Sequence, residues 1–328
     1  MALLAEAATE TDGVRPLSEH VALHLRHGGD AGVRHVLAYA PGPGHGTLVG
    51  YAHLDATDLV EGPSAELVVH PRYRGQGYGS TLVEALLAES SDGRLRLWAH
   101  GLGNREDSPA GRLAWSLGFR RARSLWQMRR SLRTPIPAAT LPAGVRVRTF
   151  RPGQDDEAWL RLNSRAFANH PEQGHWSLVD LHRRMAERWF DPPGFFLAER
   201  VGDNLDGQHP LVGFHWTKVH GSTGRARPSQ DRHDPDRHGH EPIGEVYVVG
   251  VDPDERGTGL GRALTAIGLR HLRDRGLAEA MLYVDADNAW AIRVYERLGF
   301  TRWDTDVMFV RDRVDTAHNQ PARATMQP

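Results

Sequence analysis

The sequence contains no cysteine, and only one of its 40 basic residues, Lys218, is a lysine. Without cysteine the chain can form no disulfide, no thiolate metal site and no acyl-cysteine intermediate. A formal net charge of −1 gives no excess of positive charge for binding nucleic acids or anionic membranes. There is no signal-like start and no apolar run of the ~18 residues that span a membrane. We therefore expect a soluble cytoplasmic monomer without nucleic-acid or membrane partners.

The stretch from Val246 to Arg275 reads as a strand, a glycine-rich turn and a helix. A valine-rich run ends at Asp252-Pro253, and Gly257, Gly259 and Gly261 follow at alternate positions before apolar residues with helical spacing. Glycines let the backbone tighten, so consecutive amide N–H groups can face one anion at the positive end of a helix. This pattern predicts a diphosphate site.

Three diphosphate-binding motifs compete for this stretch. A P-loop requires Gly-Lys-Ser/Thr, but Gly261 is followed by Arg262 and Ala263. A dinucleotide fingerprint requires a third glycine at the position of Arg262. The spacing Arg256-x-x-Gly259-x-Gly261 instead resembles the signature of the GNAT superfamily of N-acetyltransferases, whose loop and helix hold the pyrophosphate of acetyl-coenzyme A.

The segment from Asn288 to Phe300 strengthens this resemblance. In the superfamily pattern Asn288 lies beside the cofactor, and Tyr295 lies on a helix that ends at a Leu-Gly-Phe turn. The alternative for any single residue is an ordinary helix capped by Gly299, in which Tyr295 serves packing. The order and separation of the two motifs together favour the acetyltransferase interpretation.

The strand–glycine turn–helix stretch from Val246 to Arg275 has a counterpart earlier in the chain. Arg74, Gly77 and Gly79 repeat the signature, Leu117-Gly-Phe119 repeats Leu298-Gly-Phe300, and Leu48-Val-Gly-Tyr51 repeats Leu211-Val-Gly-Phe214. The fold class expected is therefore α/β, with two tandem GNAT-like domains, each a mixed central sheet flanked by helices. The expected parts are a domain over 1–132, a proline-rich linker over 133–144, a catalytic domain over 145–313 and a disordered tail over 314–328.

The second copy carries extra residues over 221–242, which are rich in glycine, proline and histidine and predict a mobile loop. His233, His238 and His240 lie in this loop. Their spacing is irregular and no acidic or cysteine framework surrounds them, so we assign no metal.

Only the second copy has the reactive pair that the superfamily resemblance implies. Glu245 would be the general base, Tyr295 the general acid, and the backbone of Val249 to Val251 would hold the acetyl and pantetheine groups. In the first copy Pro63 and Ala114 stand opposite Glu245 and Tyr295. The first domain is therefore expected to be non-catalytic, either a coenzyme-binding or substrate-covering domain or a structural relic.

At the level of the whole chain, His170-Pro-Glu-Gln-Gly174, Gly213-Phe-His-Trp-Thr-Lys-Val-His220 and the strand from Gly244 to Val251 are similar to the mycothiol synthase family. That family acetylates the cysteinyl amine of a cysteine–glucosamine–inositol conjugate, with acetyl-coenzyme A as donor. The resemblance implies substrate contacts at Glu19, Glu172, Lys218, Glu245 and Tyr283.

The resemblance also implies contacts with acetyl-coenzyme A in both copies. In the second copy these residues are Val249, Gly250, Val251, Arg256, Gly257, Thr258, Gly259, Leu260, Gly261, Arg262, Asn288, Ala289, Ala291, Ile292 and Arg293. In the first copy they are Leu67, Val68, Val69, Gly75, Gln76, Gly77, Tyr78, Gly79 and Ser80. Two alternatives stay open: an N-acetyltransferase of another amine or of a protein amino terminus, and a non-catalytic acetyl-coenzyme A sensor.

Overall fold

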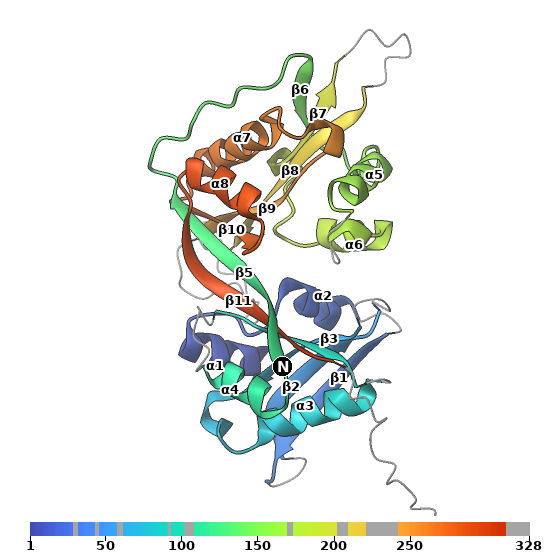
Figure 1. The fold of residues 1–328 in the computed structure, drawn as a ribbon, viewed down its shortest axis with the longest axis vertical. Coiled ribbons are helices and arrows are strands. Elements are labelled where there is room, and N and C mark those ends of the chain that lie inside the picture. The colour runs from blue at the N-terminus through green and yellow to red at the C-terminus, as the bar shows by residue number, and fades with distance from the viewer. Residues whose placement is uncertain are drawn as a thin grey trace, which may run out of the picture. The chain divides into compact units, whose positions relative to one another are not determined.

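The computed structural model describes residues 1–28, 32–42, 46–57, 62–90, 93–101, 108–168, 173–201, 209–220 and 242–312 (Figure 1). The expected loop, apart from Pro242, and the expected tail lie outside these residues. None of the helices in the described ranges is long and apolar enough to cross a membrane.

The chain divides into two compact units. The first contains the residues up to Arg123 together with the chain from Asp306 onward, and the second contains Ser124–Thr305. Both cuts fall inside strands, because β5 spans Arg120–Ser131 and β11 spans Thr301–Arg311.

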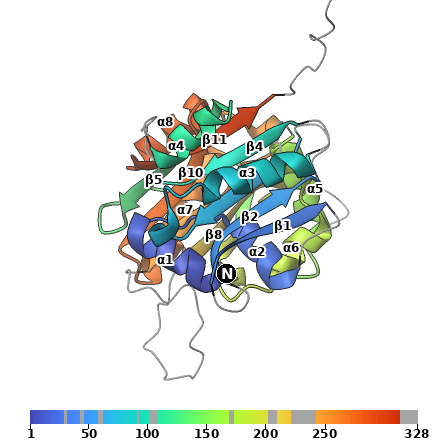
Figure 2. The same cartoon turned by 90° about the horizontal axis from the view of Figure 1, so that it is seen from below.

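The first unit is a mixed sheet covered by helices on both faces. Its strands are ordered β1, β2, β3, β4 and the end of β11, and β3 and β4 run parallel. Helix α3 lies over one face of the sheet (Figure 2). Its leucine and valine side chains pack there with the core of β2 and β4, whereas α1 and α2 cover Tyr51 and Val68 on the other face. The bounds are α1 Ala2–Asp12, α2 Glu19–His27, β1 Val33–Ala40, β2 Thr47–Asp55, β3 Ser64–Val69, α3 Tyr78–Glu89, β4 Leu95–Ala99 and α4 Pro109–Ser116.

The second unit repeats this plan with the strand order β5, β10, β9, β8, β7, β6. Ala266, Leu269 and Leu272 of α7 pack on one face of the sheet, and Trp159 of α5 and Leu181 of α6 pack on the other. The bounds are β6 Val145–Thr149, α5 Asp156–Ala166, α6 Leu178–Met185, β7 Phe195–Arg200, β8 Leu211–His220, β9 Ile243–Val251, η4 Pro253–Glu255, α7 Leu260–Asp274, β10 Glu279–Asp285 and α8 Ala289–Arg297. The α/β class, with mixed sheet strands flanked by helices in each unit, is thus confirmed.

The last strand of each sequence repeat completes the sheet of the other repeat. In the second unit β5 pairs antiparallel with β10, from Leu125 opposite Asp285 to Ser131 opposite Glu279. In the first unit the end of β11 pairs antiparallel with β4, from Val307 opposite Ala99 to Arg311 opposite Leu95. The domain boundaries expected at 132 and 145 follow the order of the repeats along the sequence. They do not include this exchange of strands.

Candidate active site

Strand β9 carries a β-bulge at Tyr247. Toward β8, Val246 pairs with Thr217 and Val248 with Trp216, which leaves Tyr247 as an extra residue. The bulge changes the alternation of side chains, since Val246 joins the core under α7 whereas Tyr247 and Val248 both join the core under α5 and α6. Bulges of this kind re-aim side chains beside functional sites.

On its other side β9 soon parts from its parallel neighbour β10. Within these two fully described strands, the pairing comprises Gly244 with Ala280 and Glu245 with Met281. The main-chain groups of Val249 to Val251 therefore make no ladder with β10 and can bind an extended ligand. In the first unit the equivalent parallel pair, β3 with β4, also ends early, at Glu66 opposite Trp98. The first unit differs in that β2 pairs with β3 without a bulge.

The glycine loops of the two copies share one backbone conformation. Gly257 and Gly259 have φ of 81° and 87°, and Gly75 and Gly77 have φ of 73° and 89°. A Cβ at any of the four would meet nothing within 4 Å, so each loop has an open side. The loops end at Gly259 and Gly77, the N-caps of α7 and α3, where unpaired N–H groups favour an anion.

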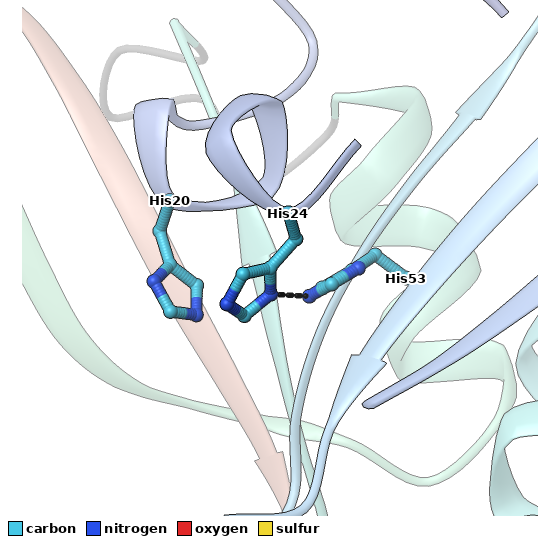
Figure 3. A group of neighbouring side chains, drawn as sticks. All are labelled: His20, His24 and His53. Atoms are coloured by element: carbon cyan, nitrogen blue, oxygen red, sulfur yellow. Dashed lines mark hydrogen bonds between the residues drawn. The ribbon is translucent and has the colours of Figure 1, made fainter. Parts of the chain in front are cut away.

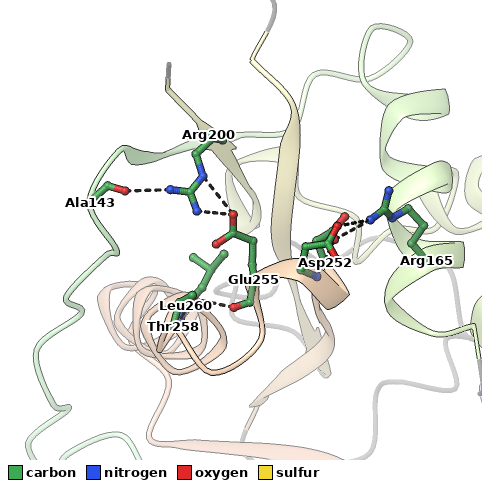
Figure 4. Close-up of polar contacts among 8 residues, drawn as sticks. Ala143, Arg165, Arg200, Asp252, Glu255, Thr258 and Leu260 are labelled. Carbon is green, nitrogen blue, oxygen red and sulfur yellow. Dashed lines mark hydrogen bonds and ion pairs between the residues drawn. The ribbon is translucent and has the colours of Figure 1, made fainter. Parts of the chain in front are cut away.

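Acidic residues before the glycine loop of the second copy form ion pairs with two arginines (Figure 4). Arg200 binds Glu255, and Arg165 Nη2 lies 2.9 Å from Asp252 Oδ1. Thr258 Oγ1 donates to the carbonyl of Glu255 at 2.8 Å, which closes the turn before α7.

The arginines of the two loops have different hydrogen-bond partners. Arg74 donates from Nη1 and Nη2 to the two carboxylate oxygens of Asp12, each at 2.7 Å. Arg256 is exposed and donates to the carbonyl of Ala166 at 3.2 Å. A carboxylate thus balances the charge of Arg74, whereas the charge of Arg256 stays available to a phosphate.

Glu245 lies among polar and aromatic side chains on the α5–α6 face of the sheet. It is 7% exposed, and its Oε2 lies 2.6 Å from Nε2 of His220. Lys218 stands opposite Glu245 in the β8–β9 ladder, so the two side chains share a face. Nζ of Lys218 lies 4.6 Å from the ring centroid of Trp189 and 5.1 Å from that of Tyr247.

His220 is a site residue that the sequence analysis missed. It ends the Phe-His-Trp-Thr-Lys-Val-His segment, two residues after Lys218 and therefore on the same strand face. That spacing is the signal that could have identified it.

Tyr295 belongs to the other face of the sheet, where it packs with the core under α7. Its ring meets Phe300 edge to face at 6.0 Å, and burial raises the pKa of its hydroxyl to about 12. Tyr295 is therefore protonated at neutral pH and can act as a proton donor. Glu245 and Tyr295 lie on opposite faces of the sheet. One ligand can therefore contact both only at the point where β9 and β10 separate.

The other predicted contacts lie in several environments. Tyr283 on β10 is 40% exposed, and its hydroxyl accepts a hydrogen bond from Gln127 Nε2 at 2.8 Å. Asn288 caps α8, because its Oδ1 accepts from the N–H of Ala291 at 3.0 Å. Glu19 begins α2 in the first unit. Glu172 lies outside the described residues.

Some of the predicted cofactor-binding residues have side chains that lie in the hydrophobic core. Val68, Leu260 and Ile292 are buried in hydrophobic clusters. A Cβ at Gly250 would come within 2.5 Å of the ring of Phe214, so packing alone requires this glycine. For these four residues only main-chain contacts with a cofactor remain as a prediction.

Each of the two repeats matches a known acetyltransferase family. The family described as "Acetyltransferase (GNAT) family" matches residues 157–300, and "Acetyltransferase (GNAT) domain" matches residues 32–121. The chain is 60% identical over 308 residues to a mycothiol acetyltransferase of Acidothermus cellulolyticus, covering 94% of this chain and 89% of that protein. It is 56% identical over 334 residues to a mycothiol acetyltransferase of Streptosporangium roseum, covering 93% of both.

A solved structure shows the same architecture. A tandem GNAT protein from the clavulanic acid biosynthesis pathway superposes with a TM-score of 0.65 over 94% of this chain and 93% of that one. At 19% sequence identity this likeness concerns the fold.

Proposed function

Because the chain belongs to the mycothiol acetyltransferase family of tandem GNAT enzymes, we propose that it acetylates the cysteinyl amine of the cysteine–glucosamine–inositol conjugate. The observation that carries this proposal is 60% identity along nearly the whole of both chains. Acetyl-coenzyme A supplies the activated acetyl group as a thioester. The product of this step is mycothiol.

The second unit would bind the donor through its main chain. The unpaired edge of Val249 to Val251 suits the amide-bearing pantetheine arm, and the open loop through Gly257 and Gly259 suits the diphosphate. Arg256 adds an exposed positive charge beside this loop. The residues present therefore fit acetyl-coenzyme A.

Glu245 would act as the general base. The acceptor amine must lose a proton before it attacks the thioester carbon, and a carboxylate positioned near it can accept that proton. His220 Nε2 at 2.6 Å fixes the orientation of the Glu245 carboxylate. The nitrogen–carbon bond then forms directly, because the chain has no cysteine to carry the acetyl group.

Tyr295 would complete the transfer from the opposite face of the sheet. Breaking the carbon–sulfur bond leaves a thiolate, which needs a proton. The raised pKa of Tyr295, about 12, keeps the hydroxyl protonated until that moment. Solvent then restores the proton to Tyr295.

The acceptor would contact Glu19, Glu172, Lys218, Glu245 and Tyr283. Its ammonium group suits carboxylates, and its sugar and inositol hydroxyls suit Lys218 and Tyr283. Lys218 packs between Trp189 and Tyr247 and is 6% exposed, so its ammonium group is held in a fixed position.

The proposed base is tested by Glu245→Gln, which keeps the size of the side chain and removes its basicity. We expect kcat to fall by about 10²-fold or more, because general base catalysis contributes roughly this much. Binding of coenzyme A, followed by calorimetry, should be unchanged. Glu279→Gln, at the exposed start of β10, is the matched control and should keep full activity. A near-normal rate for Glu245→Gln at neutral pH would assign the base elsewhere.

A further inference from the structure

Three histidines meet in the first unit, away from the glycine loops. His20 and His24 lie on α2, and His53 lies on β2 (Figure 3). One ring nitrogen from each lies within 4.8 Å of the corresponding nitrogens of the other two. This cluster was not predicted from the sequence, because residues 24 and 53 are brought together only by folding.

Helix and strand geometry place these rings. His20 and His24 are four residues apart, so they lie on one face of α2, one turn from each other. Their ring centroids are 4.2 Å apart, and that of His24 lies 5.2 Å from His53. Ser18 caps the start of α2 by accepting from the N–H of Val21 at 3.4 Å, and its own N–H donates to Glu66 at 2.6 Å.

The nitrogen separation matches a tetrahedral metal. His24 Nδ1 and His53 Nε2 are 3.3 Å apart. Two imidazole nitrogens bound at about 2.0–2.1 Å to a tetrahedral Zn²⁺ lie roughly 3.3 Å from each other. The cation would therefore take the place of the proton that these two rings share, without moving the backbone.

Outer contacts hold the rings as in known metal sites. The second ring nitrogen of His53, Nδ1, lies 3.5 Å from the hydroxyl of Tyr51, which in turn lies 2.8 Å from Nδ1 of His35. Asp55 Oδ2 lies 2.7 Å from Nε2 of His20 and brings negative charge to the cluster. Such partners orient ligating histidines and support metal affinity.

The cluster also has the access to solvent that a metal ion needs. His20 is exposed, with 48% of its side chain accessible, which gives an ion a path to the buried pair.

We propose that His20, His24 and His53 form a Zn²⁺-binding site that fastens α2 to β2 of the first unit. Zinc suits three imidazoles and leaves a fourth position, which a water molecule or the Asp55 carboxylate can fill. The site is structural, since none of its residues belongs to the proposed acetyl-transfer site. Because His20 follows Glu19 directly, bound zinc would also hold the start of α2, which carries that predicted acceptor contact.

The test is a zinc titration of the chelator-treated full chain against a chromophoric competitor, with Co²⁺ absorption as a second readout. We expect one equivalent of zinc per chain, a tetrahedral Co²⁺ spectrum and a higher Tm with zinc. His20→Ala, at an exposed position that folding should tolerate, is expected to weaken binding by about 100-fold or more. His53→Asn should do the same while its circular dichroism remains native.

Histidines of the 221–242 segment are the competing source of metal binding. His238→Gln combined with His240→Gln is therefore the matched control, and it should retain the equivalent of zinc and the Co²⁺ spectrum. The proposal is overturned if the native chain binds no zinc in this assay, if His20→Ala binds as tightly as the native chain, or if the control variant loses the site.

Discussion

His100 is held between two carboxylates in the first unit. Its Nε2 lies 3.4 Å from Glu66 Oε2 and its Nδ1 lies 3.1 Å from Asp306 Oδ2. Burial alone would lower the pKa of His100, but the two carboxylates outweigh it and raise that pKa to about 10. Asp306 also accepts from the N–H of Gly101 at 2.9 Å, so this group anchors the exchanged end of β11.

The pH dependence follows from the sign of this shift. A raised pKa means that the folded protein binds the proton more tightly than the unfolded chain, whose ordinary value is 6.5. The stabilisation is complete below that value and is lost as the pH rises through about 10. We expect His100→Gln to lower the Tm at neutral pH, with the gap to the native protein closing as the pH approaches 10. His175→Gln, at an exposed position, is the control, and a gap that does not change with pH would exclude a protonated His100.

Single residues were predictable from the sequence where a motif specifies their type and spacing. Glu245 and Lys218 were singled out in this way, and the structure brings them together on paired strands. Their partners His220 and Trp189 were not predicted. Their contacts depend on how β8 packs with the segment that follows α6. The histidine cluster was missed for the same reason.

At the scale of elements, the two strand–loop–helix units invite a matched substitution. Gly77 and Gly259 have nearly the same φ and the same open side, so a glutamate at either position costs similar backbone strain. Gly259→Glu should abolish activity, because its carboxylate would occupy the proposed diphosphate position. Gly77→Glu should retain most of the activity. Initial rates and circular dichroism measure both, and equal loss in two folded variants would refute this division between the copies.

The elements themselves were largely predictable. The strand and the helix expected over 246–275 correspond to β9 and α7, and the glycine turn lies between η4 and α7, since hydrophobic periodicity and glycine spacing are local signals. The bulge at Tyr247 could not be foreseen, because it is defined by the register against β8. The β9–β10 ladder ends before Val249 to Val251, the backbone to which the superfamily resemblance assigned the acetyl and pantetheine groups.

At the scale of the whole molecule, the exchanged strands make the two repeats depend on each other. A fragment of residues 145–328 lacks β5 and exposes the edge of β10. We expect this fragment to aggregate or to lose cooperative thermal unfolding, whereas a fragment of residues 120–328 restores β5 and should be the better folded of the two. Near-ultraviolet circular dichroism and thermal melts compare them. A cooperative transition of the shorter fragment at the Tm of the longer one would show that β5 contributes nothing.

The central claim is that this enzyme acetylates a cysteinyl amine on a sugar–inositol scaffold. Its most direct test is the initial rate with acetyl-coenzyme A and three acceptors: the cysteine–glucosamine–inositol conjugate, glucosamine–inositol without the cysteinyl group, and an unrelated primary amine. We expect a kcat/KM for the conjugate at least about 10²-fold above the others, because glucosamine–inositol lacks the cysteinyl amine and a simple amine lacks the sugar and inositol hydroxyls, so polar groups of the site stay unpaired. Mass spectrometry should place the acetyl group on the cysteinyl nitrogen. Equal rates with all three acceptors would contradict it.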